Sequence, residues 1–153
     1  MLRAGLAGAA SGSRSQLAIA ALSLTAPTAT RSRGPAGRID ALLRSRIARG
    51  IVVTAAAAEL IGDKLPQAPS RLSPPALGTR LVLGGLAGAL IAARGGTDQR
   101  ASAITAAVAA AVSSVVGSRA RAALTRRLGS DLPGAFAEDA VALSLAAISA
   151  RAG

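Results

Sequence analysis

Residues 101–117 have the sequence ASAITAAVAAAVSSVVG, which contains no charged residue and consists mostly of alanine, valine and serine. Two further apolar runs, residues 81–93 and 133–150, flank it in the chain. A water-soluble core built mainly from alanine would bury little area, and at about 25 cal/mol per Å² it would offset the chain entropy poorly. Helices in a bilayer instead associate through close backbone contact, which favours small residues. These runs therefore predict a membrane protein.

The composition of the whole chain fits a bilayer better than water. Of 153 residues, 51% are hydrophobic and 16% are charged, whereas a soluble domain is about 25% charged. The chain has no cysteine and no histidine, which excludes thiolate metal sites and mechanisms of the Ser-His or Cys-His type. It also has one Phe and no Trp or Tyr, so the aromatic belt common in membrane proteins is missing. We expect no enzymatic activity, no cofactor and no metal.

The net charge of +11 comes almost entirely from arginine. GC-rich coding sequence, which enriches Ala, Arg and Gly together, explains the high arginine content as well as a functional role for the positive charge does. Among functional explanations we favour anionic lipid as the partner. Nucleic acid is the weaker candidate, because the chain has almost no aromatic side chains for base stacking and its basic residues are scattered.

Five apolar runs predict an all-α fold, a small membrane bundle of four to five short transmembrane helices in a single domain of residues 1–153. The runs cover residues 2–26, 38–62, 81–93 (or from 76), 101–117 and 133–150. Loops are predicted at residues 27–38 and at the proline-rich residues 63–79. No run reaches the roughly 20 apolar residues of a robust span, so an Ala-rich soluble helical protein stays as an alternative.

The distribution of arginine conflicts with a simple alternation of five spans. The positive-inside rule places residues 31–49, with their six arginines, in the cytoplasm. Five alternating spans would put the arginines of residues 119–127 on the far side. Either one short run does not cross, or the topology is unusual. Within residues 38–62 the spacing of Ile39, Leu42, Leu43 and Ile47 predicts an interfacial helix that enters the bilayer at residues 51–53.

The first run is interrupted by the polar residues 11–16. A continuous helix would place Arg14 near mid-membrane at a cost of about 2.5–3.5 kcal/mol, whereas a broken helix would place it in a protein-lined pocket. Residues 1–38 hold five arginines and many serines but no acid, so a removable transit leader is the competing interpretation.

Small residues at GxxxG spacing predict two helix-packing faces, Gly8 with Gly12 and Gly84 with Gly88. The sequence GLAGA occurs at residues 5–9 and again at 85–89. Glu59 follows the first copy, and Glu138 the second, at nearly the same distance along the chain. Two degenerate repeats, residues 1–80 and 81–153, would fit a duplicated transporter fold. In a chain so rich in Ala and Gly, such matches also arise by chance.

Charged residues within or beside the apolar runs form the candidate polar site. Glu59 and Asp63 lie four residues apart on one helix face, and their repulsion requires a nearby cation, a shared proton or a bound ion. Glu138 and Asp139 interrupt the last apolar run. For Glu59 and Asp63 we favour a helix end in the headgroup region, paired with Lys64 and Arg71, over a functional polar site. For Glu138 and Asp139, a position near the helix N-terminus and charge pairing inside the bundle explain the pair equally well. The candidate site comprises Arg14, Glu59, Asp63, Lys64, Arg71, Arg80, Arg119, Glu138 and Asp139.

The region around Glu59 also resembles a known family. An apolar helix leads into Glu59, Asp63, Lys64 and Pro66, and these are followed by Pro69, Arg71, Arg80 and the glycines of residues 84–88. This order resembles a family of small bacterial integral membrane proteins of unknown function with a Glu-x-x-x-Asp-Lys-x-Pro motif. Residues 11–14 and the pair Glu138-Asp139 are similar to its Gly-x-Arg element and its late acidic helix. The resemblance implies a bacterial inner membrane location and a helical architecture, and it implies no activity.

Two functions fit these observations. One is a small multi-pass permease or ion-coupled carrier, in which buried carboxylates and arginines form a midplane site and Glu59 or Glu138 exchanges a proton. The other is a non-catalytic scaffold or accessory subunit, whose glycine faces bind partner membrane helices or a second copy. A membrane enzyme is the weakest candidate, because no ligand or nucleophile spacing is recognisable.

Overall fold

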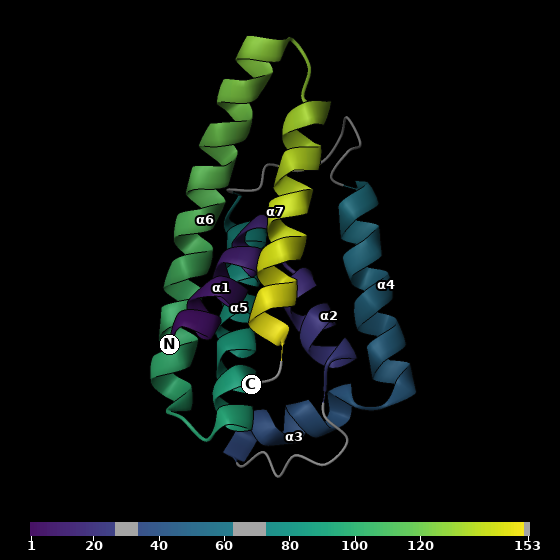
Figure 1. The fold of residues 1–153 in the computed structure, drawn as a ribbon, viewed down its shortest axis with the longest axis vertical. Helices are drawn as coiled ribbons and strands as arrows, with labels where there is room; N and C mark the ends of the chain where they lie inside the picture. The colour runs from purple at the N-terminus through teal and green to yellow at the C-terminus, as the bar shows by residue number, and fades with distance from the viewer. Residues whose placement is uncertain (27–33, 63–72, 152–153) are drawn as a thin grey trace.

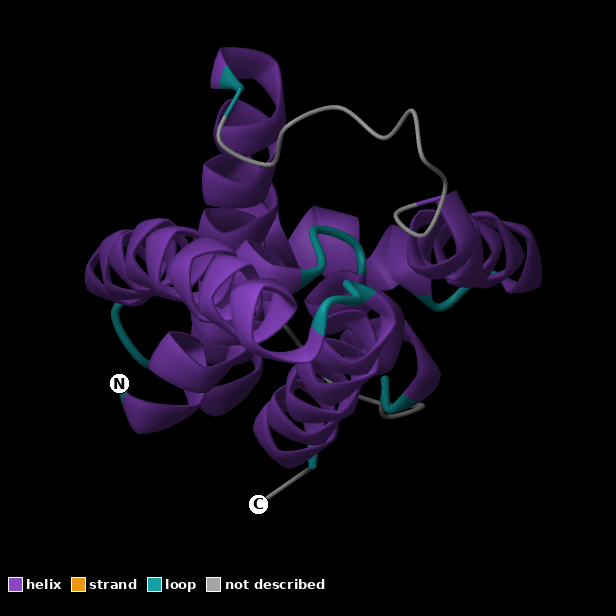
Figure 2. Ribbon diagram, turned by 90° about the horizontal axis from the view of Figure 1, so that it is seen from above, coloured by secondary structure: helices purple, strands orange, loops and turns teal. Residues whose placement is uncertain are grey.

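The computed structural model describes residues 1–26, 34–62 and 73–151, and in these ranges it contains helices and no strand (Figures 1 and 2). The all-α prediction is confirmed. The helices are α1 (Leu2–Ser13), α2 (Leu17–Leu24), α3 (Gly34–Leu43), α4 (Arg46–Gly62), α5 (Pro74–Gly95), α6 (Gln99–Leu128) and α7 (Leu132–Ala150). Three of them, α5, α6 and α7, are long and apolar enough to cross a membrane. A count of four to five spans stays a prediction.

Several helix limits differ from the predicted ones for local reasons. Residues 34–38 and 74–79, predicted as loops, lie in α3 and α5. Pro74 and Pro75 occupy the first turn of α5, where a missing N–H group costs nothing. The helix predicted through residues 38–62 is broken between Leu43 and Arg46. The boundary between the two proposed repeats, at residues 80 and 81, falls inside α5, and the duplication stays a prediction.

Helix α6 continues well beyond residue 117, where its apolar run ends, and it is closed by clear capping residues. The Asp98 carboxylate accepts hydrogen bonds from the backbone N–H groups of Arg100 (2.8 Å) and Ala101 (3.1 Å), which is the usual N-cap arrangement. At the other end Gly129 has φ of +67°, a left-handed conformation that glycine adopts without strain.

The centre of the bundle is packed with small residues. Helix α1 lies against α5, α6 and α7, and it meets α6 through Gly8 and Gly12. A Cβ atom on Gly8 would lie 2.6 Å from the Cα of Ala106, far closer than van der Waals contact. On α5, a Cβ atom on Gly88 would lie 2.7 Å from the Cβ of the same Ala106. The two glycine faces therefore pack on one helix of the same chain.

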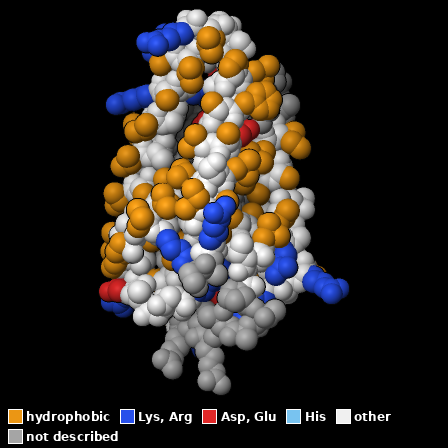
Figure 3. Space-filling model, viewed as in Figure 1, with side chains coloured by type: hydrophobic (Ala, Val, Ile, Leu, Met, Phe, Trp, Pro, Cys, Tyr) orange, Lys and Arg blue, Asp and Glu red, His pale blue; other side chains and the backbone are white. Residues whose placement is uncertain are grey.

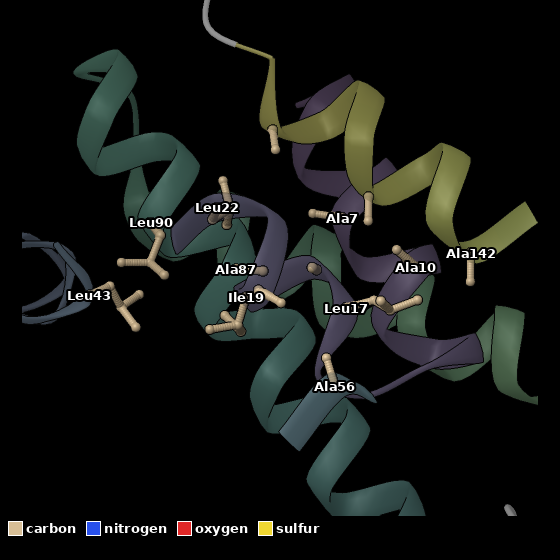
Figure 4. Packing of buried hydrophobic residues seen from close by; sticks show 14 of the residues in the cluster. Ala7, Ala10, Leu17, Ile19, Leu22, Leu43, Ala56, Ala87, Leu90 and Ala142 are labelled. Atoms are coloured by element: carbon tan, nitrogen blue, oxygen red, sulfur yellow. The ribbon is translucent and has the colours of Figure 1, made fainter. Parts of the chain in front are cut away.

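The larger buried side chains gather beside this centre, around α2 (Figure 4). Leu17, Ile19 and Leu22 of α2 are buried with Leu43 of α3 and Leu90 of α5. Alanines of α1, α4, α5 and α7 fill the space between them. This cluster attaches α2 and the peripheral α4, whose buried residue is Ala56, to the rest of the bundle.

The distribution of side-chain size is the reverse of that in a soluble protein. On α6 the buried positions are small and spaced four apart: Ser102, Ala106, Ala110 and Ser114. The exposed positions with the same spacing are β-branched: Ile104, Val108, Val112 and Val116. Figure 3 shows hydrophobic side chains spread over the outer surface of α6 and α7, with arginine or lysine toward the two ends. An outer surface of large aliphatic groups around a small-residue core indicates a membrane protein.

The first apolar run folds back on itself instead of traversing the bundle. At the start of α1, Arg3 Nε donates to the Ser149 carbonyl near the end of α7 (3.1 Å). At its end, the Gly12 carbonyl accepts from Ser114 Oγ, at the midpoint of α6 (2.9 Å). Helix α2 then returns, and its Leu22 carbonyl accepts from Arg94 at the end of α5 (2.9 Å). Helices α1 and α2 thus form a splayed hairpin whose tip lies about half-way along the bundle (Figure 1).

Candidate functional site

Arg14 lies at the tip of the hairpin and is fully buried. Its backbone is extended (φ −139°, ψ 107°), which ends α1 and directs the chain toward α2. Its side chain meets Asp139 of α7. The Nε atom donates to Asp139 Oδ1 at 2.7 Å, and Nη2 lies 2.5 Å from the same oxygen. The broken helix therefore places Arg14 in a protein-lined pocket, which was one of the two outcomes expected for this residue.

Glu59 of α4 occupies the opposite side of the tip, where α2 begins. One carboxylate oxygen accepts hydrogen bonds from the Ser15 backbone N–H and from Ser15 Oγ, both at 2.8 Å. The other accepts from the Gln16 backbone N–H at 2.9 Å. Since the first N–H groups of a helix have no partner within it and carry partial positive charge, an acid from a distant helix is a suitable acceptor. Glu59 thereby joins α4 to the hairpin.

Arg80 of α5 completes the tip from the side of α1. It is almost fully buried, and its Nη1 atom donates to the Gly12 carbonyl at 3.2 Å. This carbonyl belongs to the last turn of α1, where the helix dipole is negative. The two helix ends of the hairpin are thus each bound by a charge of the opposite sign, from α4 and α5.

The site as a whole contains two guanidinium groups and two carboxylates, so its formal charges balance. These four side chains come from the hairpin and three separate helices, and all lie away from both ends of the bundle. Such an arrangement can hold a proton on a carboxylate, or exchange one internal partner for a charged group of a solute. Either event would weaken a contact that fixes the hairpin tip.

The remaining predicted residues lie elsewhere. Glu138 faces Arg121 of α6 at 3.9 Å, and Arg121 also binds Asp131 through its Nε atom (2.6 Å). Arg119, expected as a partner for an acid, is exposed. Asp63, Lys64 and Arg71 lie outside the described residues. Of the predicted site, the structure therefore brings together Arg14, Glu59, Arg80 and Asp139. The glycines at 8, 12, 84 and 88 line the neighbouring helix contacts.

A second buried charge cluster was not predicted. Asp40 of α3 is fully buried, and its Oδ1 accepts from Nε (2.8 Å) and Nη2 (2.6 Å) of Arg94. Its Oδ2 accepts from Arg44 at 2.8 Å. Asp40 is the only acidic residue before Glu59 in the sequence, in a region rich in arginine, and this isolation is the signal that could have identified it. The cluster fixes α3 across the end of α5.

Replacing Asp40 with asparagine is expected to destabilise the protein by about 1.5–3 kcal/mol, because two arginines lose charge-assisted hydrogen bonds. Asp98→Asn is the matched control, since asparagine caps a helix as well as aspartate does. Denaturant unfolding of the detergent-solubilised protein, followed by circular dichroism, measures both. Equal stability of the two variants would contradict this account of Asp40.

Among the described residues, no group of three or more His, Cys, Asp or Glu side chains is placed to hold a metal ion. No protein-family model, curated protein or solved structure matches the chain. The resemblance to a family with a Glu-x-x-x-Asp-Lys-x-Pro motif therefore stays a prediction. Of that motif the structure describes Glu59, whose three hydrogen bonds to the hairpin tip give it a specific structural position.

Proposed function

We propose that the chain is a multi-pass protein of the bacterial inner membrane and acts as a proton-coupled carrier through the polar site at the hairpin tip. The observation that supports this most strongly is Arg14, fully buried against Asp139 half-way along the bundle. Ionisable groups within a membrane segment are costly, and they commonly mark ion and proton pathways. Broken helices with their ends directed at a midplane site are typical of carriers.

In the proposed topology α4, α5, α6 and α7 cross the membrane, and the α1–α2 hairpin enters and returns. The end of the bundle that carries Arg44, Arg46, Arg49, Arg94 and Arg100 then faces the cytoplasm. A non-crossing first run leaves four spans. Because α4, α5 and α6 separate them, the arginines of residues 119–127 still lie on the side opposite to Arg44, Arg46 and Arg49. Extraction with alkaline carbonate should leave the chain in the membrane, and its release into the soluble fraction would contradict the location.

Glu59 is the group that we propose exchanges the proton. Its carboxylate is bound by hydrogen bonds from Ser15 and Gln16, whereas Asp139 is bound by a guanidinium. Protonation would remove acceptor capacity from the start of α2, so uptake of a proton would loosen the hairpin tip.

The test is proton flux in proteoliposomes under an imposed pH gradient, followed with an internal pH-sensitive dye. Glu59→Gln is expected to lower the flux by about tenfold or more, because glutamine cannot release a proton. It also loses the hydrogen bonds to a charged carboxylate, which contribute about 1.5–3 kcal/mol. Glu138→Gln is the matched control, because Glu138 faces Arg121 of α6 and accepts none of the hydrogen bonds that bind Glu59 to Ser15 and Gln16. Flux that is unchanged in Glu59→Gln, or lowered equally in both variants, would argue against the carrier.

The scaffold alternative has less support. It relied on the faces of Gly8 with Gly12 and of Gly84 with Gly88 as docking surfaces for partner helices or a second copy. Both faces are covered by α6 of the same chain, so neither is open to another helix.

A further inference from the structure

A mostly apolar groove of about 280 Å³ runs between α2, α4 and α7. The described residues of its lining are all uncharged. They are Leu17, Ala20, Ala21 and Leu24 from α2, Val53, Ala56, Ala57 and Leu60 from α4, and Leu143, Ala146 and Ala147 from α7. The groove lies on the outside of the bundle, beside the hairpin. In a membrane such a surface is in contact with acyl chains.

Two arginines lie one helical turn beyond the groove, at the same end. Arg49 precedes Val53 by four residues on α4, and Arg151 follows Ala147 by four residues at the end of α7, so each shares a face with a lining residue. The Nε atom of Arg49 is buried and has no hydrogen-bond partner among the described residues. Figure 1 places the start of α4 and the end of α7 toward the same end of the molecule.

We infer that this groove and the two arginines form a binding site for an anionic phospholipid. One acyl chain lies in the groove, and the phosphate and the net negative headgroup lie against Arg49 and Arg151. Apolar lining alone would accept any lipid. The two arginines favour a headgroup with net negative charge over a zwitterionic one, and basic pockets between helices at the cytoplasmic side are typical sites for anionic headgroups.

This site rests on the membrane location proposed above but not on transport. It lies against α2 and α4, the two helices that Glu59 joins, so a bound lipid would also hold α4 against the hairpin. Within the protein itself, Ala56 is the one residue of α4 that is buried. The lipid therefore has a structural role in the part of the bundle with the least internal packing.

The experiment is native mass spectrometry of the intact, detergent-purified protein after titration with phosphatidylglycerol or phosphatidylcholine. Wild-type protein is expected to retain phosphatidylglycerol preferentially. Each of Arg49→Gln and Arg151→Gln should lower its apparent affinity by about fivefold, the effect of about 1 kcal/mol per arginine. Arg49→Lys should restore most of the loss. Arg127→Gln, at the opposite end of the bundle, is the matched control.

A third variant tests the groove separately from the charges. Ala57→Leu places a larger side chain in the groove and should lower the retention of both lipids. The lipid that still binds should show the same preference for phosphatidylglycerol over phosphatidylcholine. Equal retention of the two lipids by wild-type protein would overturn the site. So would losses in Arg49→Gln and Arg151→Gln no larger than in Arg127→Gln, or an unchanged affinity in Ala57→Leu. Proton flux does not enter these measurements, so failure of the carrier proposal is distinguishable.

Discussion

Arg14→Met is expected to destabilise the protein by about 3–5 kcal/mol, because it leaves Asp139 nearly buried without its positive partner. Methionine is apolar and replaces most of the aliphatic part of the arginine side chain, so loss of packing contributes less than loss of the charge. The whole stability of a domain is about 5–15 kcal/mol. A change of this size should therefore be visible as a large fall in the midpoint of denaturant unfolding.

A double substitution separates the missing charge from any other effect of the mutation. In Arg14→Met with Asp139→Leu, both charged groups are replaced by apolar ones, and we expect most of the lost stability to return. Arg119→Met is the control for removal of an arginine in general, since Arg119 is exposed. A double variant as unstable as Arg14→Met alone would show that the Arg14–Asp139 pair is not the source of the effect.

Two glycines of α1 are expected to respond in opposite directions to the same substitution. Gly8→Ala should destabilise the protein by about 1–3 kcal/mol, because the added methyl group collides with the backbone of α6 at Ala106. Gly5→Ala adds the same group where no atom lies within 4 Å. There alanine should stabilise the helix by about 0.5–1 kcal/mol relative to glycine.

The two glycine variants are compared in one unfolding series with wild-type protein in the same detergent. Because the substitutions are identical and lie one turn apart, their difference in helix propensity cancels, and the remaining difference reports the contact between α1 and α6. A Gly8→Ala variant as stable as Gly5→Ala would contradict the close approach of the two helices.

The long helices were the part of the fold most easily predicted from sequence. Residues 101–117 and 133–150 are largely apolar, so their helical conformation follows from local properties. The start of α5 at Pro74 was missed, because the proline-rich residues 63–79 were predicted as a loop. The limits of α6 were missed, because its last turns carry arginine and extend beyond the apolar run. Hydropathy marks where a helix is apolar, not where its hydrogen bonding ends.

Only part of the site could be predicted from the sequence, because burial of a charged side chain depends on contacts between distant segments. Arg14 and Asp139 were both selected as charges in apolar runs, but 125 positions separate them, and spacing along one helix says nothing about such a pair. Asp40 was missed although Arg44 is only four residues away, because its other partner, Arg94, becomes a neighbour only after α3 packs across α5. Glu59 was selected as a charge, while its role as a cap for α2 requires knowledge of where α1 breaks.

The hairpin also sets the order in which the chain can be assembled. Helices α1 and α2 leave the ribosome before the helices that hold them. Arg80 belongs to α5 and Asp139 to α7, and the α1 glycines pack on α6. The carboxylate that binds Arg14 at the tip, Asp139, belongs to α7, the last of the described helices. We therefore expect the hairpin to reach its final depth after the three long helices have come together.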